Sequence, residues 1–140
     1  MKKIILIILI ITVAKNVSAQ SNGVPDTLAY LQTIVANKAQ YIGQPFSTLI
    51  DNLQIQIKHF IPFASISYDK TKETSTSFSF YVKVQGDYYS LYPLLEIYWQ
   101  QPLNATQSDV IWTNNNGGGW SSAGASFYAN GIIRDIQIQE

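Results

Sequence analysis

Residues 45–61 read PFSTLIDNLQIQIKHFI, and within this stretch the spacing of the apolar residues changes. In the first half they are three or four positions apart, as on one face of a helix: Phe46, Leu49, Ile50 and Leu53. From Gln54 they alternate with polar residues, as on one face of a strand: Ile55, Ile57 and Ile61. The stretch therefore predicts a helix over 45–53 and a strand over 54–61.

Upstream of this stretch, a second helix is predicted over residues 26–40. Asp26 is a suitable N-cap, and apolar residues recur at helical spacing from Leu28 to Ile42. Gly43 can end the helix, because glycine readily adopts the left-handed conformation found there. Two helices with so short a connection predict an αα-hairpin.

Downstream, five further segments have the alternation or composition of strands: 75–84, 91–102, 109–113, 126–129 and 132–139. The last two flank Asn130-Gly131, a strong signal for a β-hairpin. The polar residues 64–75 predict a solvated loop. Because the helices precede the strands, we expect an α+β fold, in which the N-terminal αα-hairpin packs on one face of an antiparallel sheet of four to five strands, a two-layer sandwich.

The N-terminal residues have the three parts of a secretory signal peptide. Lys2 and Lys3 precede a run over 4–13 that is apolar except for Thr12, and the small residues before Gln20 offer a cleavage site. As a helix the run is about 15 Å long, too short for a hydrocarbon core of about 30 Å. We expect residues 1–19 to be cleaved, and residues 20–140 to form a single globular domain that is secreted or periplasmic.

The composition excludes several classes of function. The chain contains no cysteine, which excludes disulfides, thiol catalysis and a lipid anchor on cysteine. Its nine basic and nine acidic residues become six and nine once Lys2, Lys3 and Lys15 leave with the signal peptide. A mildly acidic domain without a basic stripe is not expected to bind nucleic acid. We therefore expect no nucleic-acid partner and no stable membrane anchor.

Two stretches resemble parts of exported bacterial proteins: YIGQPFSTLIDNL at 41–53 and FYANGIIRDIQI at 127–138. They are similar to small helix-helix-sheet proteins such as outer-membrane assembly lipoproteins and β-lactamase-inhibitor-like domains. The SAQ ending of the signal peptide resembles those of exported Bacteroidetes proteins. The resemblance implies a helix-helix-sheet layout and a role in binding other proteins, although the acylated cysteine of the lipoproteins is missing. Asp26-Thr27-Leu28 also resembles a tripeptide that Bacteroidetes O-glycosylate, and it equally fits the helix N-cap.

Few residues offer catalytic chemistry. His59, the single histidine, has the parity of the neighbouring isoleucines, so we expect a half-buried structural residue rather than a base or zinc ligand. The chain has no G-x-S-x-G motif. Glu96 and Asp135 could be neighbours across a sheet, as a glycosidase requires, but nearby basic residues can neutralise them. We expect no metal, no cofactor and no enzymatic activity.

Aromatic side chains supply the candidate binding surface: Tyr88, Tyr89, Tyr98, Trp112 and Trp120. Tyrosine and tryptophan suit both protein hot spots and the stacking of sugars. Trp120 follows the tract TNNNGGG at 113–119, within a connection predicted over 102–121. We expect its indole to dock at the edge of the sheet while residues 114–118 stay mobile.

The sequence thus predicts an exported, non-catalytic binding protein that recognises another envelope or extracellular protein. A carbohydrate-binding module that stacks glycans on exposed tyrosine and tryptophan is the alternative. A carboxylate-based hydrolase is the third possibility.

Overall fold

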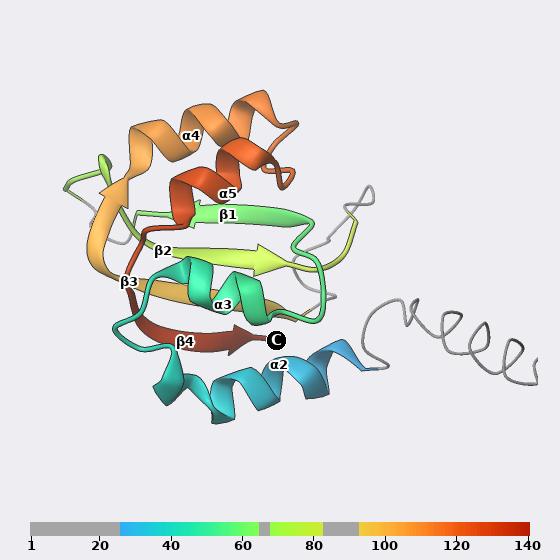
Figure 1. The fold of residues 1–140 in the computed structure, drawn as a ribbon. Helices are drawn as coiled ribbons and strands as arrows, with labels where there is room; N and C mark the ends of the chain where they lie inside the picture. The colour runs from blue at the N-terminus through green and yellow to red at the C-terminus, as the bar shows by residue number, and fades with distance from the viewer. Residues whose placement is uncertain (1–25, 65–67, 83–92) are drawn as a thin grey trace, which may run out of the picture.

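A four-stranded antiparallel sheet and its covering helices make up the part of the chain that the computed structural model describes, residues 26–64, 68–82 and 93–140 (Figure 1). The helices are α2 (Thr27–Ala36), the 3-10 helix η1 (Lys38–Gln40), α3 (Phe46–Asn52), α4 (Ala105–Asn114) and α5 (Ser122–Tyr128). The strands are β1 (His59–Phe63), β2 (Lys72–Ser79), β3 (Leu94–Asn104) and β4 (Ile133–Gln139), paired in the order β1-β2-β3-β4. The predicted α+β class with an antiparallel sheet is confirmed.

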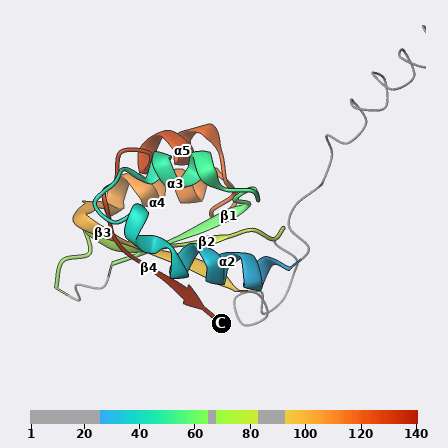
Figure 2. The same cartoon turned by 60° about the horizontal axis from the view of Figure 1, so that its bottom comes forward.

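The first two helices form close to where the sequence predicts them. The Asp26 carboxylate accepts a 3.1 Å hydrogen bond from the Ala29 N–H and so caps α2. Gly43, at φ +78°, lies in the turn before α3. The predicted αα-hairpin on one sheet face is not confirmed, because α2 lies along β4 while α3 lies over the sheet with α4 and α5 (Figure 2).

Two predicted strands and one predicted hairpin are wrong. Residues 109–113 belong to α4, which the Asn104 side chain caps by accepting a 3.1 Å hydrogen bond from the Gln107 N–H. Residues 126–129 lie at the end of α5, which the Ser121 hydroxyl caps in the same way. Asn130-Gly131 therefore turns the chain from a helix into β4 instead of joining two strands. Capping and burial against the sheet override the β-propensity of these short segments.

The hydrophobic core lies between the sheet and the helices: α3, α4 and α5 lie together on one side of the sheet in Figure 2, and α2 contributes Leu31 and Ile34. Phe46 of α3 stacks on Phe78 of β2 with ring centroids 4.7 Å apart. Tyr128 of α5 stacks on Trp99 of β3 at 5.8 Å. Each of these rings is almost completely buried, so aromatic packing fixes the two helices on the sheet.

The helices of residues 26–64, 68–82 and 93–140 are all shorter or more polar than a membrane-spanning helix.

Candidate functional site

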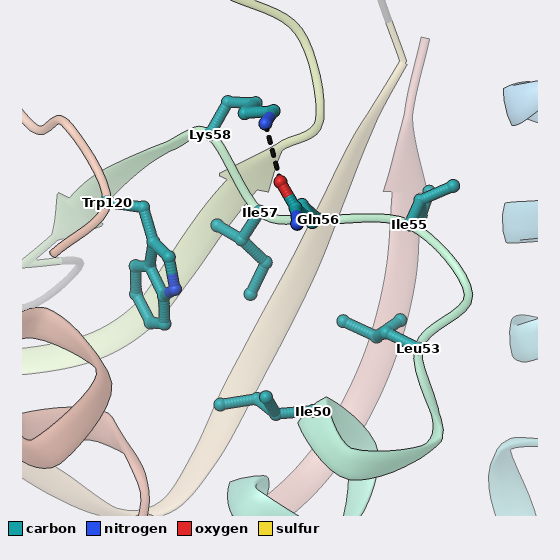
Figure 3. A pocket seen from close by; sticks show the side chains of 7 residues that line it. All are labelled: Ile50, Leu53, Ile55, Gln56, Ile57, Lys58 and Trp120. Carbon is teal, nitrogen blue, oxygen red and sulfur yellow. Dashed lines mark hydrogen bonds between the residues drawn. The ribbon is translucent and has the colours of Figure 1, made fainter. Parts of the chain in front are cut away.

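A groove of about 500 Å³ lies between the end of α3, the segment that leads into β1, and Trp120 (Figure 3). The residues that line it are Ile50, Leu53, Ile55, Gln56, Ile57, Lys58 and Trp120. In Figure 3 the side chains of Ile50, Leu53 and Ile57 point into the same space as the indole. The Lys58 ammonium donates a 2.7 Å hydrogen bond to the Gln56 side-chain oxygen at the rim. Apolar side chains therefore line one part of the groove, and Gln56 and Lys58 give it a polar and charged edge.

The extended segment along this groove is attached at both ends. At its start, the Gln54 N–H donates a 2.9 Å hydrogen bond to the Tyr30 hydroxyl of α2. At its end, the Lys58 N–H donates to the Ser79 carbonyl at 2.8 Å, and the Lys58 carbonyl accepts from the Trp120 N–H at 3.0 Å. These bonds hold the backbone between them in a defined position.

Between the two attachments, residues 55–57 form no backbone hydrogen bond with any other part of the described chain. The sequence predicts a strand beginning at Gln54, but β1 begins only at His59. The reason is that β2 ends at Ser79, so the pairing of β1 with β2 begins at His59 and, within the described residues, does not extend to 55–57. An extended segment with unpaired N–H and C=O groups has the hydrogen-bonding capacity of a sheet edge.

Trp120 packs on the core at the edge of the sheet, as predicted. Its ring lies edge-on to Phe60 and Phe78, with centroid distances of 6.1 and 5.7 Å. It is also nearly parallel to Tyr128, at 6.2 Å. The indole is half-buried, so one part of it belongs to the core and another to the wall of the groove.

The asparagine-glycine tract before Trp120 is a defined turn. The N–H groups of Gly117 and Gly118 both donate to the Trp112 carbonyl at 3.0 Å, which terminates α4. The Gly118 carbonyl then accepts a 2.9 Å hydrogen bond from the Phe60 N–H. At φ +100°, a side chain on Gly118 would have its Cβ only 2.3 Å from the Phe60 carbonyl oxygen. Glycine at this position lets the turn approach β1 closely enough to position Trp120.

The other predicted site residues lie elsewhere. Tyr98 of β3 faces away from the helices and donates a 2.9 Å hydrogen bond to Glu96. Trp112 lies in α4, and its indole N–H is buried without a hydrogen-bond partner among the described residues. Tyr88 and Tyr89 lie outside the described residues. Of the predicted aromatic surface, the structure thus places Trp120 at the groove and does not bring Tyr98 to it.

A buried carboxyl group that sequence reasoning missed lies under the helices. Glu73 of β2 is fully buried, and its Oε1 accepts hydrogen bonds from the Thr76 hydroxyl and, at 2.9 Å, from the Tyr128 hydroxyl. Thr76 in turn accepts a 2.9 Å hydrogen bond from the Trp99 indole N–H. Burial raises the pKa of Glu73, and the neighbouring hydroxyls, among them that of Ser108, act in the opposite direction.

A break in the sheet register places Glu73 on the helix side. Glu73 pairs with Leu103 and Ser75 with Tyr98, so residues 99–102 of β3 have only Thr74 opposite them. Side chains of a regular strand alternate between faces, so residues three apart cannot share one. The break lets both Glu73 and Thr76 face the helices. The sequence signal was a polar run, which predicts a loop instead.

The carboxylates considered for hydrolysis are engaged in structural contacts. Glu96 is almost completely buried and accepts hydrogen bonds from Ser75 and Tyr98 at 2.9 Å and from Gln139 at 2.7 Å. Asp135 forms a 2.5 Å ion pair with Lys38, and its pKa is lowered mainly by this hydrogen bond. His59 is buried in β1, more completely than the half-buried position predicted.

Within the described ranges, no three side chains of His, Cys, Asp or Glu gather as a metal site would require. Comparisons of the chain with protein-family models, curated proteins and solved structures find no match. The groove and the buried carboxyl group are therefore the features of the molecule that bear on its function.

Proposed function

We propose that this is an exported, non-catalytic binding protein that recognises an extended segment of another protein in the groove beside Trp120. The observation that carries the proposal is the coincidence of free backbone and apolar surface at residues 55–57. An incoming peptide can pair with unpaired N–H and C=O groups as an added strand. Alternate side chains of such a strand point the same way, toward the apolar interior of the groove.

The indole of Trp120 suits the role of an anchor in this interface. Its inner part is fixed by Phe60, Phe78 and Tyr128, so little further order is required when a partner binds. A pre-ordered aromatic side chain reduces the entropic cost of association. Tryptophan is also among the residues that contribute most to binding at protein interfaces.

The ring arrangement does not favour the carbohydrate alternative. A sugar-binding platform needs exposed aromatic faces along one surface. The ring nearly parallel to Trp120 is Tyr128, which is fully buried. Tyr98 faces away from the helices, and so it cannot extend a platform from the groove.

The proposal also gives the helices α2 and α3 a joint role in shaping the groove. What supports a joint role for α2 and α3 is the hydrogen bond from Gln54, just after α3, to Tyr30 of α2. Tyr30→Phe should then speed hydrogen exchange of the Gln54 amide, while the core amides of β3 keep their rates. Unchanged exchange at Gln54 would show that α2 does not support the groove.

Site-specific photo-crosslinking in the native exporting cell tests the proposed interface. A photoreactive residue in place of Gln56, which is exposed at the groove, should capture one protein in stoichiometric amount. The matched control replaces Gln137, an exposed glutamine of β4 at the opposite edge of the sheet. Equal capture at both positions, or none at Gln56, contradicts the proposal.

A glycan array separates the alternative function. Under the proposal, glycans leave the fluorescence of the tryptophans unchanged. Saturable binding of a glycan with a spectral shift, together with no crosslinked protein at Gln56, would favour the carbohydrate-binding module instead.

A further inference from the structure

A second cavity, of about 270 Å³, lies at the other end of β1, where α4 begins. The residues that line it are Pro62, Phe63, Ala64, Lys70, Glu73, Ala105, Thr106, Ser108 and Asp109. Glu73 and Ser108 are fully buried, whereas Lys70, Thr106 and Asp109 are exposed. The buried pair therefore forms the floor of the cavity and the exposed residues form its rim.

The two oxygens of the Glu73 carboxyl group differ in their hydrogen bonding. Its Oε1 already accepts from Thr76 and Tyr128. Its Oε2 is buried and has no hydrogen-bond partner in the described part of the chain. The hydroxyl of Ser108 has a single hydrogen, which it donates to the Ala105 carbonyl at 3.1 Å. The Ser108 hydroxyl also lies close enough to Glu73 to lower the pKa of its carboxyl group, and with its hydrogen on the Ala105 carbonyl it can still accept a further hydrogen bond.

An unpaired buried carboxylate oxygen is costly, and the cost is removed either by a proton on the carboxyl group or by a ligand that donates a hydrogen bond to it. Leaving a charged acceptor desolvated and unpaired destabilises a protein more than any single neutral hydrogen bond stabilises it. The groups left unsatisfied at the floor, Glu73 Oε2 and the Ser108 oxygen, are both acceptors. Asp109 adds a third acceptor at the rim, with no hydrogen-bond or ion-pair partner among the described residues.

The chemistry complementary to three acceptors is a group with several donors and a positive charge. An ammonium group has three donors and no acceptor. Its hydrogen bonds to carboxylates are charge-assisted and stronger than neutral ones. Two carboxylates against the single Lys70 give the lining a net negative charge, which favours a cation.

We propose that this cavity, the β1-α4 pocket, binds the primary ammonium group of a small ligand, with Glu73 and Ser108 as acceptors at its floor and Asp109 at its rim. The half-exposed ring of Phe63 supplies an apolar wall for the carbon chain that bears the nitrogen. This site is separate from the groove at Trp120: the two cavities share no lining residue.

Titration of the complete mature chain with ethylammonium chloride, followed by amide NMR, tests the proposal. We expect saturable shifts confined to the amides around Thr106, Ser108 and Asp109. Sodium chloride at equal ionic strength and tetramethylammonium, a cation without N–H groups, should not reproduce them. Equal shifts with either salt would reduce the effect to general charge screening and overturn the proposal.

Substitutions locate the acceptors. Glu73→Gln should weaken ethylammonium binding about tenfold, because a charge-assisted hydrogen bond is lost. Asp109→Asn, on the exposed rim, should weaken it less and leave the fold intact, so the test survives if Glu73→Gln unfolds. Asp51→Asn, an exposed residue of α3, is the matched control. Binding unchanged in Asp109→Asn as well as in Glu73→Gln would overturn the assignment.

Lys70→Met distinguishes an external ligand from an internal one. If a ligand supplies the ammonium group, removal of the competing side chain should leave ethylammonium binding intact or tighter. If Lys70 itself reaches Glu73, Lys70→Met should destabilise the wild-type protein as much as Glu73→Gln does, and the wild type should bind no ethylammonium. The second result would overturn the proposal.

Discussion

The Tyr128 hydroxyl at the end of α5 donates a 2.9 Å hydrogen bond to Oε1 of Glu73 near the start of β2. It joins a helix and a strand 55 positions apart in the sequence, and both partners are fully buried. The same ring stacks on Trp99 and Trp120. Tyr128 therefore connects the buried carboxyl group with the wall of the groove.

Tyr128→Phe should destabilise the protein by about 1–3 kcal/mol, because it leaves a buried carboxylate with one donor fewer. The ring packing is retained, so the loss of stability is due to the missing hydroxyl group alone. Urea unfolding at neutral pH measures the change. Tyr68→Phe is the control, since Tyr68 is 92% exposed. A loss of equal size in both variants would contradict a special role for the bond.

The stability should fall as the pH rises above the ordinary Glu pKa of about 4.5. Burial raises the pKa of Glu73 in the folded state, so the unfolded chain releases this proton first. The decline ends at the pKa of Glu73 in the folded protein, above which this carboxyl group is ionised in both the folded and the unfolded state. Lys70 and Asp109, which line the same pocket, and Tyr128, which donates a hydrogen bond to Glu73, are unchanged in the comparison with Glu73→Gln.

In Glu73→Gln this decline should disappear, because no proton remains to be released at that position. The Asp135 carboxyl contributes in another window: its pKa is lowered, so its stabilisation is lost as the pH falls below about 3.8. Urea unfolding at a series of pH values separates the two. A decline of the same slope in wild type and Glu73→Gln would assign it to another group.

Gly118→Ala should destabilise the protein more than Gly43→Ala. Both glycines have positive φ, so alanine carries a backbone penalty of about 1–2 kcal/mol at either position. Only at Gly118 does the added Cβ also collide with Phe60 and Trp112; at Gly43 no atom lies within 4 Å. The difference between the midpoints of unfolding of the two variants measures how much stability is lost because the turn lies so close to β1. Equal midpoints would show that the turn can move away.

Export predicts a defined N-terminus. Protein recovered from the periplasm or medium of the native cell should begin at Gln20, as cleavage after Ala19 requires. Intact-mass measurement and N-terminal sequencing check this. A chain that retains Met1 or fractionates with the membrane would contradict export as a free protein.

The sequence predicted the elements whose side-chain periodicity is strong. The start of α2 at the Asp26 cap and the positions of α3 and β4 agree with the spacing of their apolar residues. The strands β2 and β3 were also found, with boundaries shifted by a few residues. Regular patterns reveal which side of an element is buried.

Neither α4 nor α5 was predicted, and the reasons are physical. Residues 109–113 are rich in β-branched and aromatic side chains, and the α4 cap at Asn104 was hidden at the end of a strand. The predicted hairpin at Asn130-Gly131 relied on local turn chemistry, whereas contacts of Tyr128 with the core fix α5. Tertiary packing is not visible in a local pattern.

The candidate sites depended still more on long-range geometry. Trp120 was singled out by its glycine-rich neighbourhood, but its groove is built mainly from residues 50–58, far away in the sequence. Glu73 could not be recognised, because its burial results from the register break and from helices that were not predicted.

Because of that register break, the burial of the Glu73 carboxyl group depends on the length of β3 as well as on the residue at position 73. Four residues of β3 lie opposite the single residue Thr74 of β2, a surplus of three that the exposed residues 100–102 can account for, and without this surplus Glu73 and Thr76 would project from opposite faces. Shortening this surplus, with every buried side chain kept, would turn the carboxylate out of the interior and open the pocket floor. Among chains of similar sequence, a gap or insertion between Tyr98 and Leu103 would therefore separate those that keep this pocket from those that have lost it, even where the glutamate is retained.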